Sequence, residues 1–86
     1  MGRTHDGYMA VQYEWQRVAS ELERRITSGE IPPGGRLENE RELAERYQVS
    51  TGTVRRAVRE LRDRGLVETL PVKGTYVVEQ DGEPSE

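Results

Sequence analysis

The sequence predicts a mainly α fold with a small β component, namely a winged helix-turn-helix of three helices plus a C-terminal β-hairpin wing. Apolar residues recur at helical spacing in three segments, and a link of only two residues separates the second segment from the third. Two β-prone runs around a turn then follow the helices. We expect one small domain at residues 11–79, between a flexible N-terminal arm at 1–10 and an acidic disordered tail at 80–86.

The first helix is expected to begin near Val11 and to end at Ser28-Gly29. Its apolar residues lie three or four positions apart, on one helix face: Trp15, Val18, Ala19, Leu22 and Ile26. The segment from Ile31 to Gly35 contains two prolines, which lack amide donors, and two glycines. We therefore expect a turn between the first helix and the second.

Side-chain caps define the starts of the next two helices. Asn39 is an N-cap candidate, and Glu42, three residues later, completes a capping box. After the link Gln48-Val49, Ser50 is the N-cap candidate of the third helix, and Gly65 lies at its left-handed C-terminal position. The expected core combines residues from all elements: Trp15, Val18, Leu22, Ile26, Leu43, Tyr47, Val54, Val58, Leu61, Leu66 and Val67.

The third helix concentrates positive charge on the side opposite its apolar stripe. At about 100° per residue, Arg55, Arg56 and Arg59 fall on one exposed half of the helix. Pairing of Arg56 with Glu60 and of Arg59 with Asp63 would instead give an ordinary solvated surface. That alternative leaves unexplained the small side chains that open the helix, which are Ser50, Thr51, Gly52 and Thr53. Small residues let the first helical turn approach a phosphate or the floor of a DNA groove.

The hairpin is expected from strands at 66–70 and 75–78, joined by the turn at 71–74. Lys73 lies at the tip of this wing, next to Gly74, and both are candidates for contact with a DNA phosphate or a minor groove. The alternative explanation is that Lys73 occupies a turn position at which any polar residue is tolerated.

Charge is distributed unevenly along the chain. The formal net charge is −3 at pH 7, which by itself disfavours nucleic acid. From Arg41 to Arg64, however, seven arginines face four acids, whereas the segment from Glu79 to Glu86 holds four acids and no base. The acidity therefore gathers in the tail, and the helical part carries the positive charge that a DNA-binding face needs.

Several function classes lack the residues that they need. The chain has no cysteine, and its one histidine, His5, lies in the polar N-terminal arm. We therefore expect no cofactor, no metal site and no catalytic residue, and so no enzyme. Neither a membrane span of roughly 20 apolar residues nor the apolar run of a signal peptide is visible in the sequence. We expect a cytoplasmic protein without a membrane contact.

From about Tyr13 to Val78 the chain resembles the N-terminal DNA-binding domain of the GntR family of bacterial transcription regulators. The motifs that carry the resemblance are Ile26 to Gly29, Pro33 to Leu37, Glu40 to Ala44, Val49-Ser50, Thr53 to Val58, Leu61, Gly65 to Val67 and Gly74 to Val77. Their order and spacing together are specific. The resemblance implies a third helix in the major groove and a wing at the neighbouring minor groove. It also implies DNA contacts by Arg41, Thr53, Arg55, Lys73 and Gly74.

Three positions depart from the family pattern. Glu38-Asn39 stands where the family usually has Pro-Ser, and Glu38 brings a negative charge close to the expected DNA. Thr51 replaces a common arginine directly after Val-Ser, and Val72 replaces the first wing glycine. We expect these departures to change the base preference and to leave the fold intact.

The residues and the resemblance predict sequence-specific double-stranded DNA binding in bacterial transcription regulation, by a repressor or by the DNA-binding part of one. A winged-helix protein-protein interaction module without DNA binding is the alternative. We expect a monomer in free solution and two copies on an inverted-repeat operator, because nearly all apolar residues are needed for one core. Family members typically carry a C-terminal effector-binding and dimerisation domain, which would also follow here if the chain is a fragment.

Overall fold

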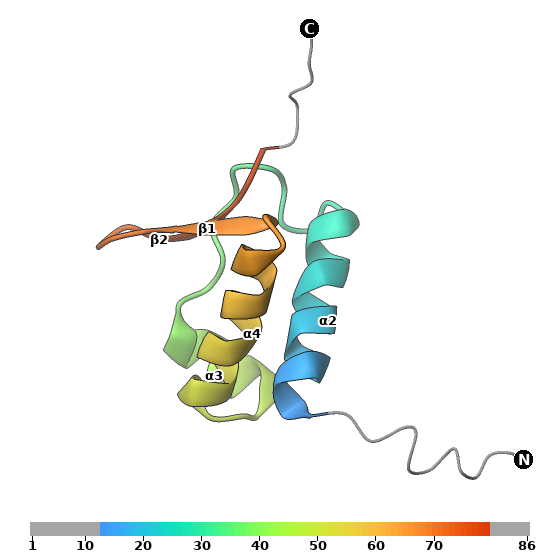
Figure 1. The fold of residues 1–86 in the computed structure, drawn as a ribbon, viewed down its shortest axis with the longest axis vertical. Helices are drawn as coiled ribbons and strands as arrows, with labels where there is room; N and C mark the ends of the chain where they lie inside the picture. The colour runs from blue at the N-terminus through green and yellow to red at the C-terminus, as the bar shows by residue number, and fades with distance from the viewer. Residues whose placement is uncertain (1–12, 80–86) are drawn as a thin grey trace, which may run out of the picture.

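The computed structural model describes residues 13–79, and its elements confirm the expected order and fold class (Figure 1). Three helices precede two strands: α2 (Glu14–Thr27), α3 (Glu40–Tyr47), α4 (Thr51–Asp63), β1 (Val67–Leu70) and β2 (Gly74–Val77). The predicted arm at 1–10, the predicted tail at 80–86 and the predicted helix start near Val11 lie outside the described residues. Within residues 13–79, no helix is long and apolar enough to cross a membrane.

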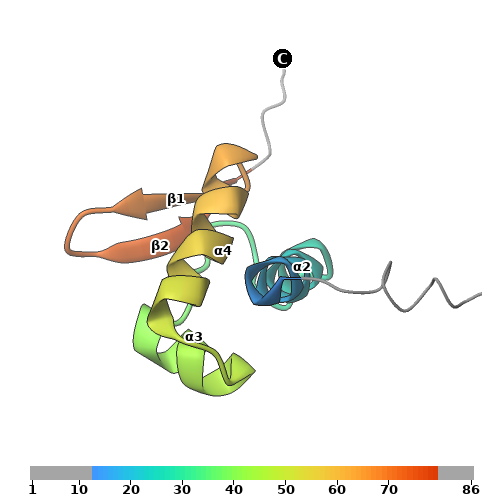
Figure 2. The same ribbon diagram turned by 60° about the horizontal axis from the view of Figure 1, so that its bottom comes forward.

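The central element of the domain is α4. It packs against α2 along its length and against α3 near its N-terminal end, and β1 follows its C-terminal end. In Figure 2, the hairpin extends away from α2 on the other side of α4. One side of α4 is therefore bordered by α3 and the hairpin, and no helix of residues 13–79 covers it.

The helix starts follow the predicted caps. Asn39 Oδ1 accepts the Glu42 amide at 2.9 Å, and Glu42 Oε1 accepts the Asn39 amide at 3.1 Å, which confirms the capping box. Ser50 Oγ accepts the Thr53 amide at 3.1 Å and caps α4. At the other end of α4, Gly65 adopts the predicted left-handed conformation, with φ 79°. Local side-chain chemistry thus sets the bounds of both helices.

The hairpin is antiparallel, and Leu70 pairs with Gly74 beside the turn. Both strands lie within one residue of the predicted ranges. The Lys73 amide donates to the Leu70 carbonyl at 3.0 Å, which closes a four-residue turn with Pro71 and Val72 at its centre. Val72 has φ 71°, a left-handed conformation that strains a β-branched side chain.

The segment before α3 contains the predicted turn, at Pro33-Gly34, but it then becomes extended. The Leu37 amide donates to the Thr75 carbonyl at 2.9 Å, and the Val77 amide donates to the Gly35 carbonyl at 2.8 Å. This stretch therefore pairs with the second edge of β2 and ties the start of α3 to the hairpin.

The core draws on every element. Its buried apolar residues are Val18, Ala19, Leu22, Ile31, Leu37, Leu43, Ala44, Val54, Ala57, Val58, Leu61, Val67 and Val77. Helical spacing does not identify Ile31, Leu37 or Val77, because they lie in the loop and in β2. Four predicted core residues are only partly buried at the border of the cluster: Trp15, Ile26, Tyr47 and Leu66.

Candidate nucleic-acid interface

The exposed side of α4 carries two arginines one helical turn apart, Arg55 and Arg59. Both side chains are exposed, as predicted, whereas Val54 and Leu61 on the core side are fully buried. Arg55 Nε donates to Glu40 Oε2 at 3.1 Å, so an ion pair links α4 to the first turn of α3. Arg59 forms no ion pair with another residue of the described chain, so the alternative of a helix surface neutralised by its own acids does not hold there.

Arg56 does not share this face, which corrects the prediction that three arginines lie together. Its guanidinium carbon lies 4.1 Å from the centroid of the Trp15 ring, so the exposed side chain stacks on α2. A helical wheel places the Cβ direction, but a long side chain bends toward a neighbouring aromatic ring that the wheel does not contain. The alternative pairing with Glu60 is not formed either, because the Glu60 carboxylate lies 3.3 Å from Arg64 Nε.

The first turn of α4 presents small groups, as the sequence predicts. Ser50 and Gly52 are exposed, and Thr51 and Thr53 are partly exposed. Ser50 Oγ donates to Thr53 Oγ1 at 3.0 Å, which keeps both hydroxyl groups at the helix start. A Cβ atom added at Gly52 would meet only Ser50 Oγ, at 3.8 Å, among the described residues. The amide end of α4 is therefore sterically open to a ligand.

The wing is held by a hydrogen bond from the segment before α3. The Lys73 carbonyl accepts Arg36 Nε at 3.1 Å and the Tyr76 hydroxyl at 3.2 Å, while the Lys73 side chain is exposed at the turn. Gly74 has φ 123°, and a Cβ atom there would lie 2.7 Å from Arg36 Nε. The positive φ favours glycine at this position, and a larger side chain there would displace the Arg36 guanidinium group. Arg41, the remaining predicted contact residue, is exposed in the first turn of α3.

A cleft of about 370 Å³ lies between α4, the segment before α3 and the hairpin. We call it the arginine cleft, because four arginines line it: Arg36, Arg55, Arg59 and Arg62. Of the predicted contact residues, Arg55, Arg59 and Gly74 line the cleft; the others lie outside it, namely Arg41, Ser50, Thr51, Gly52, Thr53, Arg56 and Lys73.

Two arginines of the arginine cleft were not among the predicted contacts, Arg36 and Arg62. Arg62 lies seven positions after Arg55 and three after Arg59, which is the spacing of one helix side. That spacing was a usable signal, although the position of Arg62 near the negative helix end also explains its charge. Arg36 reaches the cleft only because its segment pairs with β2, and helical periodicity carries no signal for that pairing.

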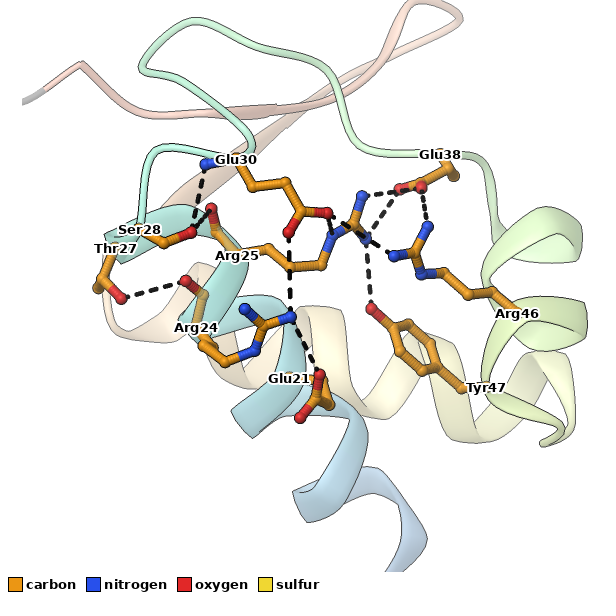
Figure 3. A network of polar contacts seen from close by, with 9 residues as sticks. All are labelled: Glu21, Arg24, Arg25, Thr27, Ser28, Glu30, Glu38, Arg46 and Tyr47. Atoms are coloured by element: carbon orange, nitrogen blue, oxygen red, sulfur yellow. Dashed lines mark hydrogen bonds and ion pairs between the residues drawn. The ribbon is translucent and has the colours of Figure 1, made fainter.

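A second set of charges joins α2 to the segment before α3 (Figure 3). Arg25 is only 6% exposed. Its Nε donates to Glu30 Oε2 at 2.8 Å, its Nη2 to Glu38 Oε2 at 2.9 Å, and its Nη1 to the Tyr47 hydroxyl at 3.2 Å. Arg46 Nη1 donates to the same Glu38 oxygen at 3.2 Å. One buried guanidinium group thus connects α2, the loop and α3.

The hydrogen bonds of this network control the charge states of its members. Burial disfavours the charged form of Arg25, but hydrogen bonds to Glu38, Tyr47 and Glu30 outweigh burial and raise the pKa of Arg25 above its ordinary value. Burial likewise opposes ionisation of Glu38, but the hydrogen bonds from Arg25 lower the pKa of Glu38 below its usual value. The negative charge that Glu38 was expected to bring close to DNA is therefore compensated by Arg25 and Arg46.

Known proteins share this arrangement of helices and wing. The family model described as "Bacterial regulatory proteins, gntR family" matches residues 15–77. This chain belongs to the gntR family. The resemblance that the sequence motifs indicate is thereby confirmed, and so is the winged-helix fold that it implies.

Two curated gntR-type relatives and one solved structure illustrate the similarity. The HTH-type transcriptional regulator YcxD of Bacillus subtilis (strain 168) is 36% identical over 69 residues, which are 80% of this chain and 16% of that protein. The mannosyl-D-glycerate transport/metabolism system repressor MngR of Escherichia coli (strain K12) is 35% identical over 66 residues, 77% of this chain and 28% of the repressor. AraR(DBD), solved in complex with operator ORX1, has a TM-score of 0.77 and 29% identity, covering 79% of this chain and 82% of that one. The gntR domain described here thus spans less than a third of the length of these curated relatives.

Proposed function

We propose that this gntR-family domain binds double-stranded DNA sequence-specifically and regulates transcription, as a repressor or as the DNA-binding part of one. The observation that carries the proposal is the exposed side of α4, where Arg55 and Arg59 lie between α3 and the hairpin. AraR(DBD) bound to an operator and the repressor MngR support it. The proposal includes a cytoplasmic location, where bacterial DNA lies, and it assigns the chain no catalytic role and no cofactor.

In the proposed complex, α4 enters the major groove with its N-terminal half. Its open first turn at 50–53 approaches the DNA, because small groups and free amides suit contact with a phosphate. Arg55 is the candidate for base reading, since a guanidinium group donates two parallel hydrogen bonds to guanine O6 and N7. Its ion pair with Glu40 is solvent-exposed and contributes about 0–1 kcal/mol. Arg55 can therefore give up its contact with Glu40 for a contact with a DNA base at little cost in free energy.

The remaining predicted contacts surround this helix. Lys73 at the wing tip is proposed to contact a phosphate or the neighbouring minor groove, and Arg41 in the first turn of α3 is proposed to contact the backbone. Arg56 would have to leave the Trp15 ring to reach DNA. We therefore place Lys73 and Arg41 ahead of Arg56 among the proposed contacts.

Assembly on DNA is the second part of the proposal: a monomer in free solution and two copies on an inverted repeat. The large hydrophobic residues exposed within residues 13–79 are Tyr13, at the start of α2, and Leu70 and Val72, in the hairpin turn. They do not form one patch, whereas a stable dimer should bury about 1,200 Å² or more. Sedimentation of the free protein, followed by titration onto one and two half-sites, measures this. A tight dimer without DNA, or one protein per full site, would contradict it.

Substitutions on α4 test the DNA-binding role. An operator is first selected from fragments of the host genome, and affinity is then measured by fluorescence anisotropy of the labelled duplex. Arg55→Ala and Arg59→Ala are expected to weaken binding, by about 5- to 150-fold where a base contact of about 1–3 kcal/mol is lost. Thermal stability should stay unchanged, because both side chains are exposed. Arg24→Ala, an exposed arginine on α2, is the matched control.

Two outcomes would overturn the proposal in different ways. If both α4 variants bind like the Arg24 control, α4 is not the recognition helix. If the unmodified protein binds no duplex at any salt concentration, the protein-protein interaction module becomes the better description of the domain.

A further inference from the structure

We infer that the arginine cleft is a binding site for a backbone phosphate of the duplex, held by Arg36, Arg59 and Arg62. The inference rests on the proposed function and adds two contact residues, Arg36 and Arg62, that were not among the contacts predicted from the sequence. Its ligand is a phosphodiester group, a monoanion with two free oxygens that guanidinium groups bind in bidentate geometry.

The charge balance of the cleft is the first argument. Two acids line it, and each is compensated: Glu38 by Arg25 and Arg46, and Glu40 by Arg55. The other three arginines of the lining form no ion pair with any residue between 13 and 79; they are Arg36, Arg59 and Arg62. Three uncompensated guanidinium groups around one cavity repel one another, and a bound anion relieves that repulsion.

The second argument is that two of these guanidinium groups are already oriented. Arg36 Nε donates to the Lys73 carbonyl at 3.1 Å, which leaves both terminal nitrogens without a hydrogen bond to the described residues. Arg62 Nη1 donates to Thr69 Oγ1 at 2.9 Å, and that hydroxyl lies 3.0 Å from Thr75 Oγ1 on the facing strand. Side chains that are fixed before binding lose less conformational entropy on binding. Each is anchored through one nitrogen, and other N–H groups remain for an anion.

The position of the cleft identifies the source of the phosphate. It lies between α4, which the proposed function places in the major groove, and the hairpin, whose tip it places at a phosphate or at the neighbouring minor groove. A single sugar-phosphate strand separates adjacent major and minor grooves of a duplex. That strand must therefore cross the mouth of the cleft. The floor is closed by Leu37, Leu43, Val54 and Val58, so the polar rim makes the contact.

Removal of one charge at a time tests the inference on the whole 86-residue chain. Arg36→Gln and Arg62→Gln are compared with Arg24→Gln, which removes the same charge from an exposed position on α2. The dissociation constant for a labelled duplex is measured from about 50 to about 200 mM salt. Each cleft variant should lower the magnitude of the slope of log K against log salt by about 0.9, the value for one lost phosphate contact. The loss should be equal for operator and scrambled duplexes, because a phosphate carries no sequence information.

The variant Arg62→Lys distinguishes the effect of the Arg62 charge on DNA binding from its effect on the stability of the hairpin. It keeps the positive charge and should retain the unmodified salt slope, even if loss of the Thr69 bond lowers the melting temperature. Inorganic phosphate identifies the source of the anion: at matched ionic strength it should compete with the duplex no better than chloride does.

The outcomes distinguish the inference from the proposed function. The unmodified protein could bind duplex DNA while Arg36→Gln and Arg62→Gln, like Arg24→Gln, keep the same slope of log K against log salt. In that case the cleft holds no phosphate and the proposed function stands. A loss confined to one base position would assign these arginines to base reading and overturn the inference. Strong competition by inorganic phosphate would make the cleft a free-anion site. Absence of salt-dependent duplex binding by the unmodified protein refutes the proposed function itself.

Discussion

Val72→Gly should stabilise the domain, although it removes a hydrophobic side chain. Val72 has φ 71° at the third position of the turn that the Lys73 amide closes onto Leu70, and Pro71 precedes it. A turn with proline second and a positive φ third favours glycine at that third position. The Val72 side chain is fully exposed, at 105% of its reference area, so its removal creates no cavity.

The magnitude follows from two opposing terms. A left-handed conformation costs an ordinary residue about 1–2 kcal/mol, and glycine avoids this cost. Glycine also loses about 0.5–1 kcal/mol more conformational entropy on folding. From the middle of each range the net stabilisation is about 0.75 kcal/mol, which raises the melting temperature of a domain of this size by about 3–6 °C.

Thermal unfolding followed by circular dichroism measures the shift in melting temperature. Val72→Asn is the second variant, because asparagine tolerates the left-handed region without the entropy cost of glycine. Val72→Ala is the control, since it removes the β-branch and keeps a Cβ atom. If the glycine and asparagine variants melt at or below the temperature of the unmodified protein, no strain is stored at this turn.

Two further substitutions test the network and the wing. Glu38→Gln should destabilise the domain by about 2 kcal/mol in urea unfolding, because it weakens the bonds of the buried Arg25. The pKa of Glu38 is lowered by folding, so its stabilisation is present above the unfolded value of about 4.3 and is lost as the pH falls through the folded value. The difference in the free energy of unfolding between Glu38→Gln and the unmodified protein should therefore vanish in acid. A difference that does not change with pH would contradict the negative charge assigned to Glu38. Gly74→Ala should lower both the melting temperature and the affinity for duplex DNA, because its Cβ atom displaces the Arg36 side chain. An unchanged affinity would show that DNA binding tolerates the displacement of Arg36.

Features that depend on neighbours in sequence were predictable. The caps at Asn39 and Ser50 join residues three positions apart, so residue type and spacing contain all the information needed. The exposure of Arg55 and Arg59 follows from helical period for the same reason.

Features that depend on contacts between distant segments could not be predicted from the sequence. Arg25 contacts Glu38 and Tyr47 across 13 and 22 positions, and nothing local marks it as a buried residue. Arg36 joins the cleft through strand pairing, and Arg56 turns to an aromatic ring on another helix. In each case a long, flexible side chain takes its direction from a partner that only the folded chain supplies.

The contact between Arg56 and Trp15 gives the domain an optical probe of its own. Trp15 is the single tryptophan of the chain, and a cation from α4 lies over its ring, so its emission reports on the one helix that is proposed to enter DNA. If Arg56 leaves the indole for a phosphate, the ring loses that cation and its emission changes without any added label. If Arg56 stays in place, emission remains constant while a labelled duplex still reports binding. Intrinsic fluorescence during a titration therefore shows whether this arginine participates in binding.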